Sequence, residues 1–549
     1  MCAGVSSTLY RHGAVHTSAD PFAEALLVEN GVVAWIGADD TADGLAARAD
    51  EVIDLDGALV APGFVDAHVH VLETGLALES IDLSPSGGIH SLADALDAVH
   101  RAAAQRPVGM QDSPLLGFGW DEQGWPEGRP PTREELDAAA GGAPVYLARV
   151  DVHSAVVSSA LTASAGLDVL PGWSFDGRVE RDAHHAARDA ARTVAPDHRT
   201  RLYRHALQHS AAQGVVSVHE QSAPFIDTRE GLRELLELTA EESGGLPHLV
   251  AYRGEQCVTV DDAREILAAI PGLTGIGGDL NIDGSLGSRT ASLRAPYSDA
   301  PDHSGSLFLT AEQICNHLTA VTRAGVQGGF HVIGDRAMDE LLIGLRAAVD
   351  VEGVEAIARR GHRLEHAELV DAPTLAAFVL LGIQLSVQPG FDAAWGGAEG
   401  MYAARLGAGR AAALNPLADL AAAGVPLAFG SDSPVTAISP WAAVRAAVQH
   451  RSVDQRISAR AAFRASTRGG WRLAGLDHTG AGELRVGSPA HLAVWRAEHL
   501  TVQAADGRFS SWSTDARAGI PLLPDMSPAA PLPECLRTVR GSTVLHDTF

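Results

Sequence analysis

The chain has 549 residues and a formal net charge of -27 at pH 7, and 46% of its residues are hydrophobic. A chain of this length can bury a large core and hold more than one domain. The acidic balance argues against nucleic acids and anionic membranes as partners, because their phosphates require a basic surface.

The composition of the chain and the spacing of its cysteines support three further expectations. No stretch of about 18 apolar residues occurs, and the first residues lack the basic, apolar and small segments of a signal peptide. The four cysteines, Cys2, Cys257, Cys315 and Cys535, are widely spaced and are expected to be reduced thiols. We therefore expect a cytoplasmic protein without membrane spans or disulfides.

The two ends of the chain have related patterns. Residues 8–60 are predicted to form short strands and turns, with Asn30-Gly31 as a hairpin signal between two apolar runs. Residues 484–495 and 536–546 are also predicted strands, which are expected to pair with the first sixty residues. We therefore expect one composite domain over 1–60 and 480–549, and a second domain over 61–479.

The first motif with chemical content is PGFVDAHVH at residues 62–70, where 65–70 is predicted to form a short buried strand. Side chains two residues apart on a strand share a face, so His68 and His70 are expected to lie side by side. Two imidazoles in this arrangement can chelate one cation. The pair alone is weak evidence, because the chain contains 24 histidines.

About 140 residues separate this strand from the next predicted strand, far more than a loop of a compact domain contains. We therefore expect an inserted α/β subdomain over about 75–205. Its predicted place, above the carboxyl ends of the strands, favours a role in shaping a substrate pocket and excluding water.

Strands and helices alternate through the rest of this domain, which is typical of a parallel sheet. Eight apolar runs fit a closed (β/α)8 barrel, in which reactive groups gather at the carboxyl ends of the strands. His331, His366 and Asp432 are then expected to converge with His68 and His70. The predicted strands are 65–70, 214–220, 247–253, 276–283, 327–332, 362–367, 383–388 and 426–432.

Imidazole and carboxylate side chains are the ligands that Zn²⁺ prefers, and a site that leaves one position open for water is typical of catalysis. A carboxylate such as Asp432, beside an activated water, can accept its proton. These residues predict a catalytic metal site for a small-molecule substrate.

Several ordered motifs extend the pattern over nearly the whole chain, and with them it resembles amidohydrolase family 3 of the amidohydrolase superfamily, a branch that includes N-substituted formamide deformylase-like proteins. The resemblance implies hydrolysis of carbon–nitrogen bonds outside ordinary peptides, on a barrel with a small β-sandwich built from both chain ends. The motifs are PGFVDAHVH at 62–70, GWDE at 119–122, PTR at 131–133, PVYLARVDVHS at 144–154, DGSLGSRTA at 283–291, FHVIGDRAMD at 330–339, RLEHAEL at 363–369, SVQP at 386–389 and GSDSPV at 430–435.

The resemblance also implies ligand roles for His68, His70, His331, His366 and Asp432. The chain departs from the family on the fourth strand, where relatives carry the lysine whose modified side chain bridges two metals. This chain contains no lysine and has Asp279 at that position. An aspartate is shorter by about four chain atoms, on the order of 5 Å, so we expect that Asp279 does not bridge the same pair.

The missing lysine favours a single ion, Zn²⁺ by preference, held by His68, His70, Asp432 and one later histidine. His331 is the preferred fourth ligand, and His366 is then expected to contact the substrate or the water. The alternatives are two ions bridged by Asp279 after a backbone shift, or a site that has lost hydrolytic activity.

Substrate contacts are predicted for Trp120, Asp121, His153 and Arg289, which fall in the family motifs. The competing interpretations are ordinary packing for Trp120 and an ion pair with Asp283 for Arg289. Two other functions stay open, a deaminase of an aminated heterocycle that uses one metal, and a catalytically degenerate regulatory member of the fold. A homo-oligomer is also possible for a barrel of this size.

Overall fold

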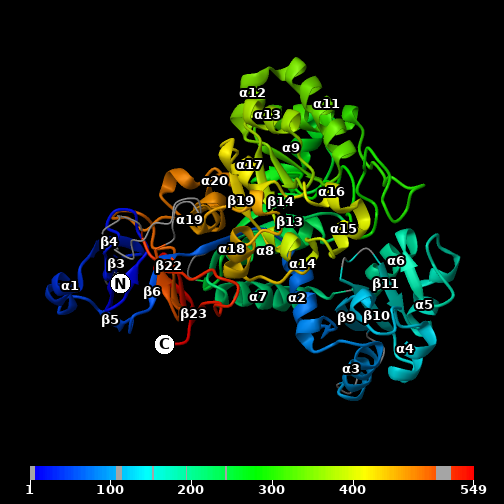
Figure 1. Cartoon of the computed structure of the whole chain (residues 1–549), viewed down its shortest axis with the longest axis horizontal. Helices are drawn as coiled ribbons and strands as arrows, with labels where there is room; N and C mark the ends of the chain where they lie inside the picture. Colours follow the sequence, from blue (N-terminus) through cyan, green and yellow to red (C-terminus); the bar gives the residue numbers. More distant parts are fainter. Residues whose placement is uncertain are drawn as a thin grey trace. The chain divides into compact units, whose positions relative to one another are not determined.

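The computed structural model describes residues 7–106, 114–150, 152, 154–192, 194–240, 244–502 and 521–549 (Figure 1). The chain divides into two compact units. The first comprises Met1–His70, Leu207–Asp432 and Thr436–Phe549, and the second comprises Val71–Ala206 with Ser433–Val435. Within the described ranges, every helix is too short or too polar to cross a membrane.

The first unit is built around a sheet of eight parallel strands, so the expected α/β barrel fold is confirmed. Each strand pairs with its neighbour in chain order, starting from β7. The strands are β7 (Phe64–Val69), β13 (Val215–Ser222), β14 (His248–Arg253), β15 (Gly275–Ile276), β16 (Gln327–Val332), β17 (Arg363–His366), β18 (Gln384–Val387) and β19 (Leu427–Phe429).

The first and last strands approach each other and nearly close the barrel. The backbone N–H of Asp432 donates to the carbonyl of His68 at 2.8 Å, and the N–H of Ser431 donates to Asp66 Oδ1 at 2.9 Å. Gly430 permits this approach, because a Cβ there would lie 2.5 Å from the backbone nitrogen of His68. The seam therefore holds Asp432 beside the first-strand histidines.

Helices follow the strands, and capping residues mark where they begin and end. Thr310 and Gln313 form a capping box at the start of α10 (Ala311–Ala324), and Gly325 ends it with a φ of 89°. The other barrel helices include α8 (Arg229–Thr239), α9 (Val260–Ala269), α11 (Asp335–Glu352), α12 (Val354–Arg360), α13 (Ala372–Leu381), α17 (Leu417–Ala422) and α18 (Pro440–Val448).

The fourth barrel strand is shorter than the predicted 276–283. Its regular pairing ends at Ile276, and Gly277 and Gly278 follow with φ values of 119° and 78°. Pairing with the next strand resumes when His331 N–H donates to Leu280 O and Ile282 N–H donates to His331 O. Residues 277–279 are therefore a bulge, a common means of redirecting a side chain.

Two smaller sheets in the same unit use strands from both chain ends. One has the order β4-β3-β1-β5 and the other β2-β6-β20-β23-β24. They share an apolar core that runs from Tyr10 to Val539. Their strands are β1 (Ser7–Arg11), β2 (Ala14–Val15), β3 (Ala25–Glu29), β4 (Val32–Gly37), β5 (Glu51–Asp54), β6 (Leu59–Pro62), β20 (Leu492–Arg496), β23 (Glu534–Arg540) and β24 (Thr543–Asp547).

The second unit has its own five-stranded sheet, in the order β12-β11-β10-β9-β8, with two apolar clusters. β8, β9 and β10 pair in parallel, whereas β11 pairs antiparallel with both β10 and β12. The elements are β8 (Ile81–Asp82), β9 (Leu115–Trp120), β10 (Val145–Arg149), β11 (Ser154–Val157), β12 (Arg178–Glu180), α2 (Val71–Glu79), α3 (Leu92–Ala104), α4 (Arg133–Ala139), α5 (Ser159–Ala165) and α6 (Arg181–Ala191), and α7 (Pro196–Ala212) runs on into the first unit.

Candidate metal centre

The carboxyl ends of the barrel strands bring six predicted ligand side chains together. β7 supplies His68 and the following His70, and β16 and β17 each supply one histidine. Asp279 and Asp432 each follow a strand by three residues. All four histidines and Asp432 are buried. The six side chains are His68, His70, Asp279, His331, His366 and Asp432.

The tightest group joins the first strand to the last. Oδ1 of Asp432 lies 3.3 Å from Nε2 of His68 and 3.1 Å from Nε2 of His70. Their three ligand atoms are close enough to bind one ion in common. The imidazole rings of His68 and His70 have centroids 5.2 Å apart and are nearly perpendicular.

Asp279 lies nearer to the histidines than its short side chain predicts. Its Oδ2 is 3.3 Å from Nε2 of His70, while its Oδ1 is 3.5 Å from Nδ1 of His331. Oδ1 is also 3.8 Å from Nε2 of His68 and 3.9 Å from Nε2 of His366. The expectation from side-chain length assumed regular strand geometry, whereas the bulge at 277–279 carries the backbone itself to the site.

Three of the histidines are oriented by oxygen atoms on their outer nitrogens. Nδ1 of His68 lies 2.8 Å from Glu365 Oε2, and Nδ1 of His70 lies 3.0 Å from the carbonyl of Gln221. Nδ1 of His366 lies 2.9 Å from the side-chain Oε1 of Gln388. Such contacts favour a proton on Nδ1, which leaves a lone pair on Nε2 for a cation. Glu365, Gln221 and Gln388 are not among the predicted site residues.

The ring of His331 has the opposite orientation, with Nδ1 rather than Nε2 toward the ligand cluster. Its Nδ1 faces Asp279, and its Nε2 lies 3.4 Å from the carbonyl of Gly284. The ring centroids of His331 and His366 are 4.4 Å apart, in an edge-to-face arrangement. These two histidines therefore stand together on the side of Asp279 Oδ1.

A buried arginine supports the outer carboxylate. Arg363 is fully buried, forms an ion pair with Glu365 and donates to the carbonyl of Ala67 at 2.6 Å. Its guanidinium also lies 4.4 Å from the ring centroid of Tyr252. Arg363 compensates the charge of Glu365 and joins the sixth strand to the first. The signal in the sequence is the RLEH motif, which places both residues directly before His366.

In the absence of an ion, the histidines and the two aspartates of the site stabilise each other as opposite charges. Burial lowers the pKa of His70, but Asp432 and Asp279 outweigh it and raise the pKa to about 9. Burial likewise opposes charge on Asp432, yet His68 and His70 hold its pKa well below the usual range. Asp279 is shifted in the same direction, because the surrounding histidines outweigh its burial and lower its pKa. Both carboxylates are ionised at neutral pH.

The donor set fits a divalent cation. Nε2 of His68 and Oδ1 of Asp279 are buried and have no hydrogen bond of good geometry, although each faces several polar atoms. Burying such atoms without a partner costs about 1–3 kcal/mol each. Two groups can hold an ion, His68 with His70 and Asp432, and His68 with Asp279 and His366. Four imidazoles and two carboxylates are the ligands that Zn²⁺ prefers.

Backbone strain gathers at two of these ligands. His366 and Asp432 have φ values of 70° and 56°, in the left-handed region that residues other than glycine seldom adopt. Each such residue costs about 1–3 kcal/mol and persists only where its surroundings impose it. At these strand ends the strain turns the side chains toward the ligand cluster.

Trp120, Asp121, His153 and Arg289 are the predicted substrate contacts. Trp120 and Asp121 belong to the second unit, where the Trp120 indole is buried and donates to the carbonyl of Leu147 at 2.9 Å. Asp121 forms an ion pair with Arg149 at 2.9 Å. These contacts agree with ordinary packing for Trp120. His153 lies outside the described residues.

Arg289 belongs to the first unit and forms an ion pair with Asp299 at 2.8 Å. Asp283 instead accepts hydrogen bonds from the backbone N–H groups of Ser292, Ile333 and Gly334. The competing interpretation, an ion pair between Arg289 and Asp283, therefore stays a prediction.

The family model described as Amidohydro_3, amidohydrolase family, matches residues 51–510. The chain belongs to the amidohydrolase family. The match spans the barrel and all six side chains of the candidate metal centre, so the resemblance inferred from the motifs is confirmed. The ligand roles of these six side chains, and the correspondence of Asp279 to the family lysine, stay predictions.

Three relatives are similar to this amidohydrolase over most of their length. It is 27% identical to Protein LONG AFTER FAR-RED 3 of Arabidopsis thaliana, over 86% of this chain and 84% of that protein. It is 24% identical to the N-substituted formamide deformylase of Arthrobacter pascens, over 77% of this chain and 80% of that enzyme. An uncharacterized metal-dependent hydrolase from Pyrococcus furiosus is 28% identical, with a TM-score of 0.69 over 89% of this chain and 98% of that one.

Proposed function

We propose that this amidohydrolase cleaves a carbon–nitrogen bond other than a peptide bond, in an amide, N-formyl compound or cyclic amide. The observation that carries the proposal is the convergence of four histidines with two ionised carboxylates at the carboxyl end of the barrel. The family model and the relatedness to a formamide deformylase support the same class of reaction.

The proposed ligands of the first ion are His68, His70 and Asp432, which form the tighter group, with His331 as the preferred fourth ligand. Zn²⁺ is the favoured cation because of the imidazole and carboxylate donors. A second ion is the alternative, supported by the two oxygens of Asp279 that face different histidines. A bound divalent cation supplies Lewis acidity, which makes water a nucleophile at neutral pH.

Three side chains have distinct proposed roles in the reaction. Asp432 is ionised, so its carboxylate accepts a proton from the attacking water and returns it to the leaving nitrogen. His366 is proposed to contact the substrate or the water through Nε2, since Gln388 holds its Nδ1. Glu365 keeps His68 in the orientation that directs Nε2 toward the centre.

Two measurements on the purified chain test these proposals. Metal analysis counts the ions per chain, and nearly two equivalents would refute the single-ion arrangement. The metal-loaded protein is then assayed with amides, N-formyl compounds, hydantoin-like rings and aminated heterocycles. Release of formate or another carboxylate supports the hydrolase, whereas ammonia from heterocycles alone would establish the deaminase instead. A chain that retains the metal but turns over none of these compounds would favour the degenerate regulatory member.

A further inference from the structure

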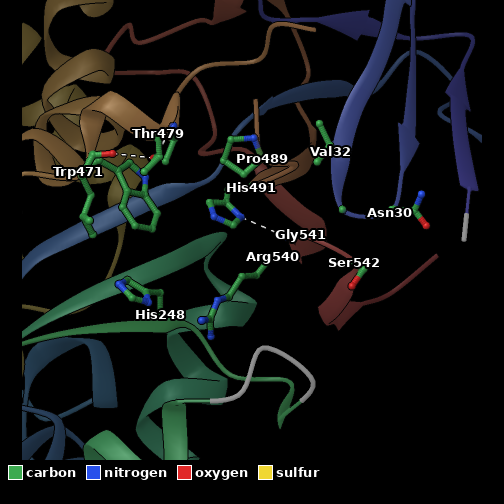
Figure 2. Close-up of a pocket in the computed structure, with 13 residues that line it drawn as sticks. Asn30, Val32, His248, Trp471, Thr479, Pro489, His491, Arg540, Gly541 and Ser542 are labelled. Atoms are coloured by element: carbon green, nitrogen blue, oxygen red, sulfur yellow. Dashed lines mark hydrogen bonds between the residues drawn. The ribbon is translucent and has the colours of Figure 1, made fainter. Parts of the chain in front are cut away.

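A cavity of about 420 Å³ lies in the first unit, where the end of the barrel meets the small sheets (Figure 2). His248, the first residue of β14, is part of its lining, whereas the candidate metal centre is at the opposite, carboxyl ends of the strands. The β14 strand spans about 17 Å at the usual rise per residue. The cavity is therefore separate from the proposed catalytic site.

Three aromatic side chains of the lining are packed together. The ring centroids of Trp471 and His248 are 5.5 Å apart with an interplanar angle of 24°. Those of Trp471 and His491 are 5.4 Å apart with an angle of 20°. Trp471 therefore stacks against imidazoles from two different parts of the chain, β14 and the segment before β20. The half-buried imidazoles of His248 and His491, held by this stacking, offer flat surface to a ring of a ligand.

Hydrogen-bond donors predominate among the charged and aromatic groups of this cavity. Arg540 is buried, and Figure 2 shows its guanidinium extending toward His248. Nδ1 of His491 accepts from the N–H of Gly541 at 3.1 Å, so Nε2 carries the proton of the neutral ring. The indole Nε1 of Trp471 is buried and has no hydrogen-bond partner, although the residue is only 3% exposed. A buried donor of this kind requires an explanation.

The charge of the lining is unusual for this chain. Among the described residues that line the cavity, none is acidic, although the whole chain has a net charge of -27. Burial and then Arg540 lower the pKa of His248 to about 4, and the same two causes lower the pKa of His491 to about 4. Both imidazoles are neutral at neutral pH, and Arg540, whose Nη1 donates to the carbonyl of Leu246 at 3.1 Å, is the charged residue among the described lining residues.

We propose that this cavity binds a small organic carboxylate with a planar ring, whose carboxylate faces Arg540 and the N–H groups of Trp471 and His491. A guanidinium and neighbouring N–H donors match the two oxygens of a carboxylate. The volume is within the range of small-molecule sites. Asn30, Thr479 and Ser542 are exposed at the rim, so a ligand can enter from solvent.

Benzoate is the probe, and its binding is measured by ligand-observed saturation-transfer NMR on chelator-treated protein, so that metal–carboxylate contacts do not contribute. Benzamide has the same shape without the charge, cyclohexanecarboxylate has the charge without the flat ring, and inorganic phosphate is a different anion. Benzoate is expected to bind saturably at millimolar concentrations and at least tenfold more tightly than the other three. Equal binding of benzamide, a preference for phosphate, or no saturable binding of benzoate would overturn the proposal.

Variants locate the binding. Arg540→Gln is expected to weaken benzoate binding at least tenfold, whereas Arg496→Gln, an exposed arginine that pairs with Glu534 outside the cavity, leaves it unchanged. Trp471→Phe keeps an aromatic ring and removes the N–H together with part of the indole, so it is expected to fold and to weaken binding about threefold. This variant carries the test if Arg540→Gln does not fold. Binding unaffected by the cavity variants would refute the assignment of the site.

Discussion

Glu365 Oε2 lies 2.8 Å from Nδ1 of His68, and both side chains are fully buried. The carboxylate thus fixes the ring of a proposed metal ligand on the side that faces away from Asp432 and Asp279. Arg363 holds Glu365 in turn and donates to Ala67, the residue before His68. Metal affinity is therefore expected to depend on this buried ion pair.

Replacing Glu365 by Gln is expected to lower the affinity for Zn²⁺ about 10- to 100-fold, because an amide orients the imidazole less strongly than a carboxylate. The change also leaves Arg363 without its buried anion, which costs about 3–5 kcal/mol of folding stability. Competition with a chromophoric chelator measures the affinity, on protein whose circular dichroism shows a folded state.

Glu355→Gln is the matched control for this prediction. Glu355 is largely exposed on α12 and pairs only with Arg359 one helical turn away, so both Zn²⁺ affinity and stability are expected to stay at the parent level. If Glu365→Gln retained parental affinity for Zn²⁺, the proposed orienting role of the carboxylate would be rejected.

Asp432→Asn removes the proposed proton acceptor. We expect the rate of amide hydrolysis to fall about 10²- to 10⁴-fold, the usual contribution of a general base. The assay is run at saturating Zn²⁺ with metal content measured in parallel, because the same side chain is a proposed ligand. Asp454→Asn, on an exposed turn, is the control. Near-parental turnover by the Asp432 variant would contradict its catalytic assignment.

Gly277→Ala tests the bulge that carries Asp279 into the site. The residue has a φ of 119°, and a Cβ there would lie 2.1 Å from the carbonyl oxygen of Gly329. We expect a loss of about 2–3 kcal/mol in unfolding free energy and weaker metal binding, because the backbone must move where Asp279 is placed. Urea denaturation and metal titration measure the two effects.

Gly409→Ala provides the comparison, since a Cβ at Gly409 in α16 (Ala408–Ala411) meets no atom within 4 Å. Its stability is expected to equal or slightly exceed that of the parent, because alanine favours helices. A Gly277 variant as stable and as tight for metal as the Gly409 variant would show that the bulge is dispensable.

Much of the barrel was predictable because its strands are short apolar runs that end in polar ligands. The HVH motif and Asp432 mark the first and last strands. The regularity of a closed parallel barrel then requires that residues at corresponding strand ends meet. For this reason the histidines and Asp432 could be grouped from the sequence alone.

The position of Asp279 was not predictable in the same way. Strand periodicity assumes regular backbone, and nothing in the letters GIGGD states that both central glycines adopt positive φ. The outer contacts were missed for a related reason, since Gln221 acts through its backbone carbonyl and Gln388 meets His366 from another strand. Such contacts depend on tertiary placement, which spacing along the chain does not encode.

Two buried histidines, His317 and His362, are expected to make folding stability depend on pH. Burial lowers the pKa of His317 to about 4 and, with the positive charge of neighbouring groups, the pKa of His362 to about 3. Both rings accept a backbone N–H through Nδ1, from Cys257 and Gly328 respectively. They are therefore neutral in the fold, and the hydrogen bonds require an unprotonated Nδ1.

The unfolded chain takes up protons on these imidazoles below a pH of about 6.5, while the folded chain does not. Folding stability therefore rises with pH between about 4 and 6.5, and each histidine contributes up to about 1.4 kcal/mol per pH unit to the slope. His362→Gln keeps an acceptor and a donor but cannot be protonated. Urea midpoints in the presence of a chelator, which keeps both proteins metal-free, are expected to show a shallower slope for this variant, and equal slopes would mean that His362 is protonated in the native fold.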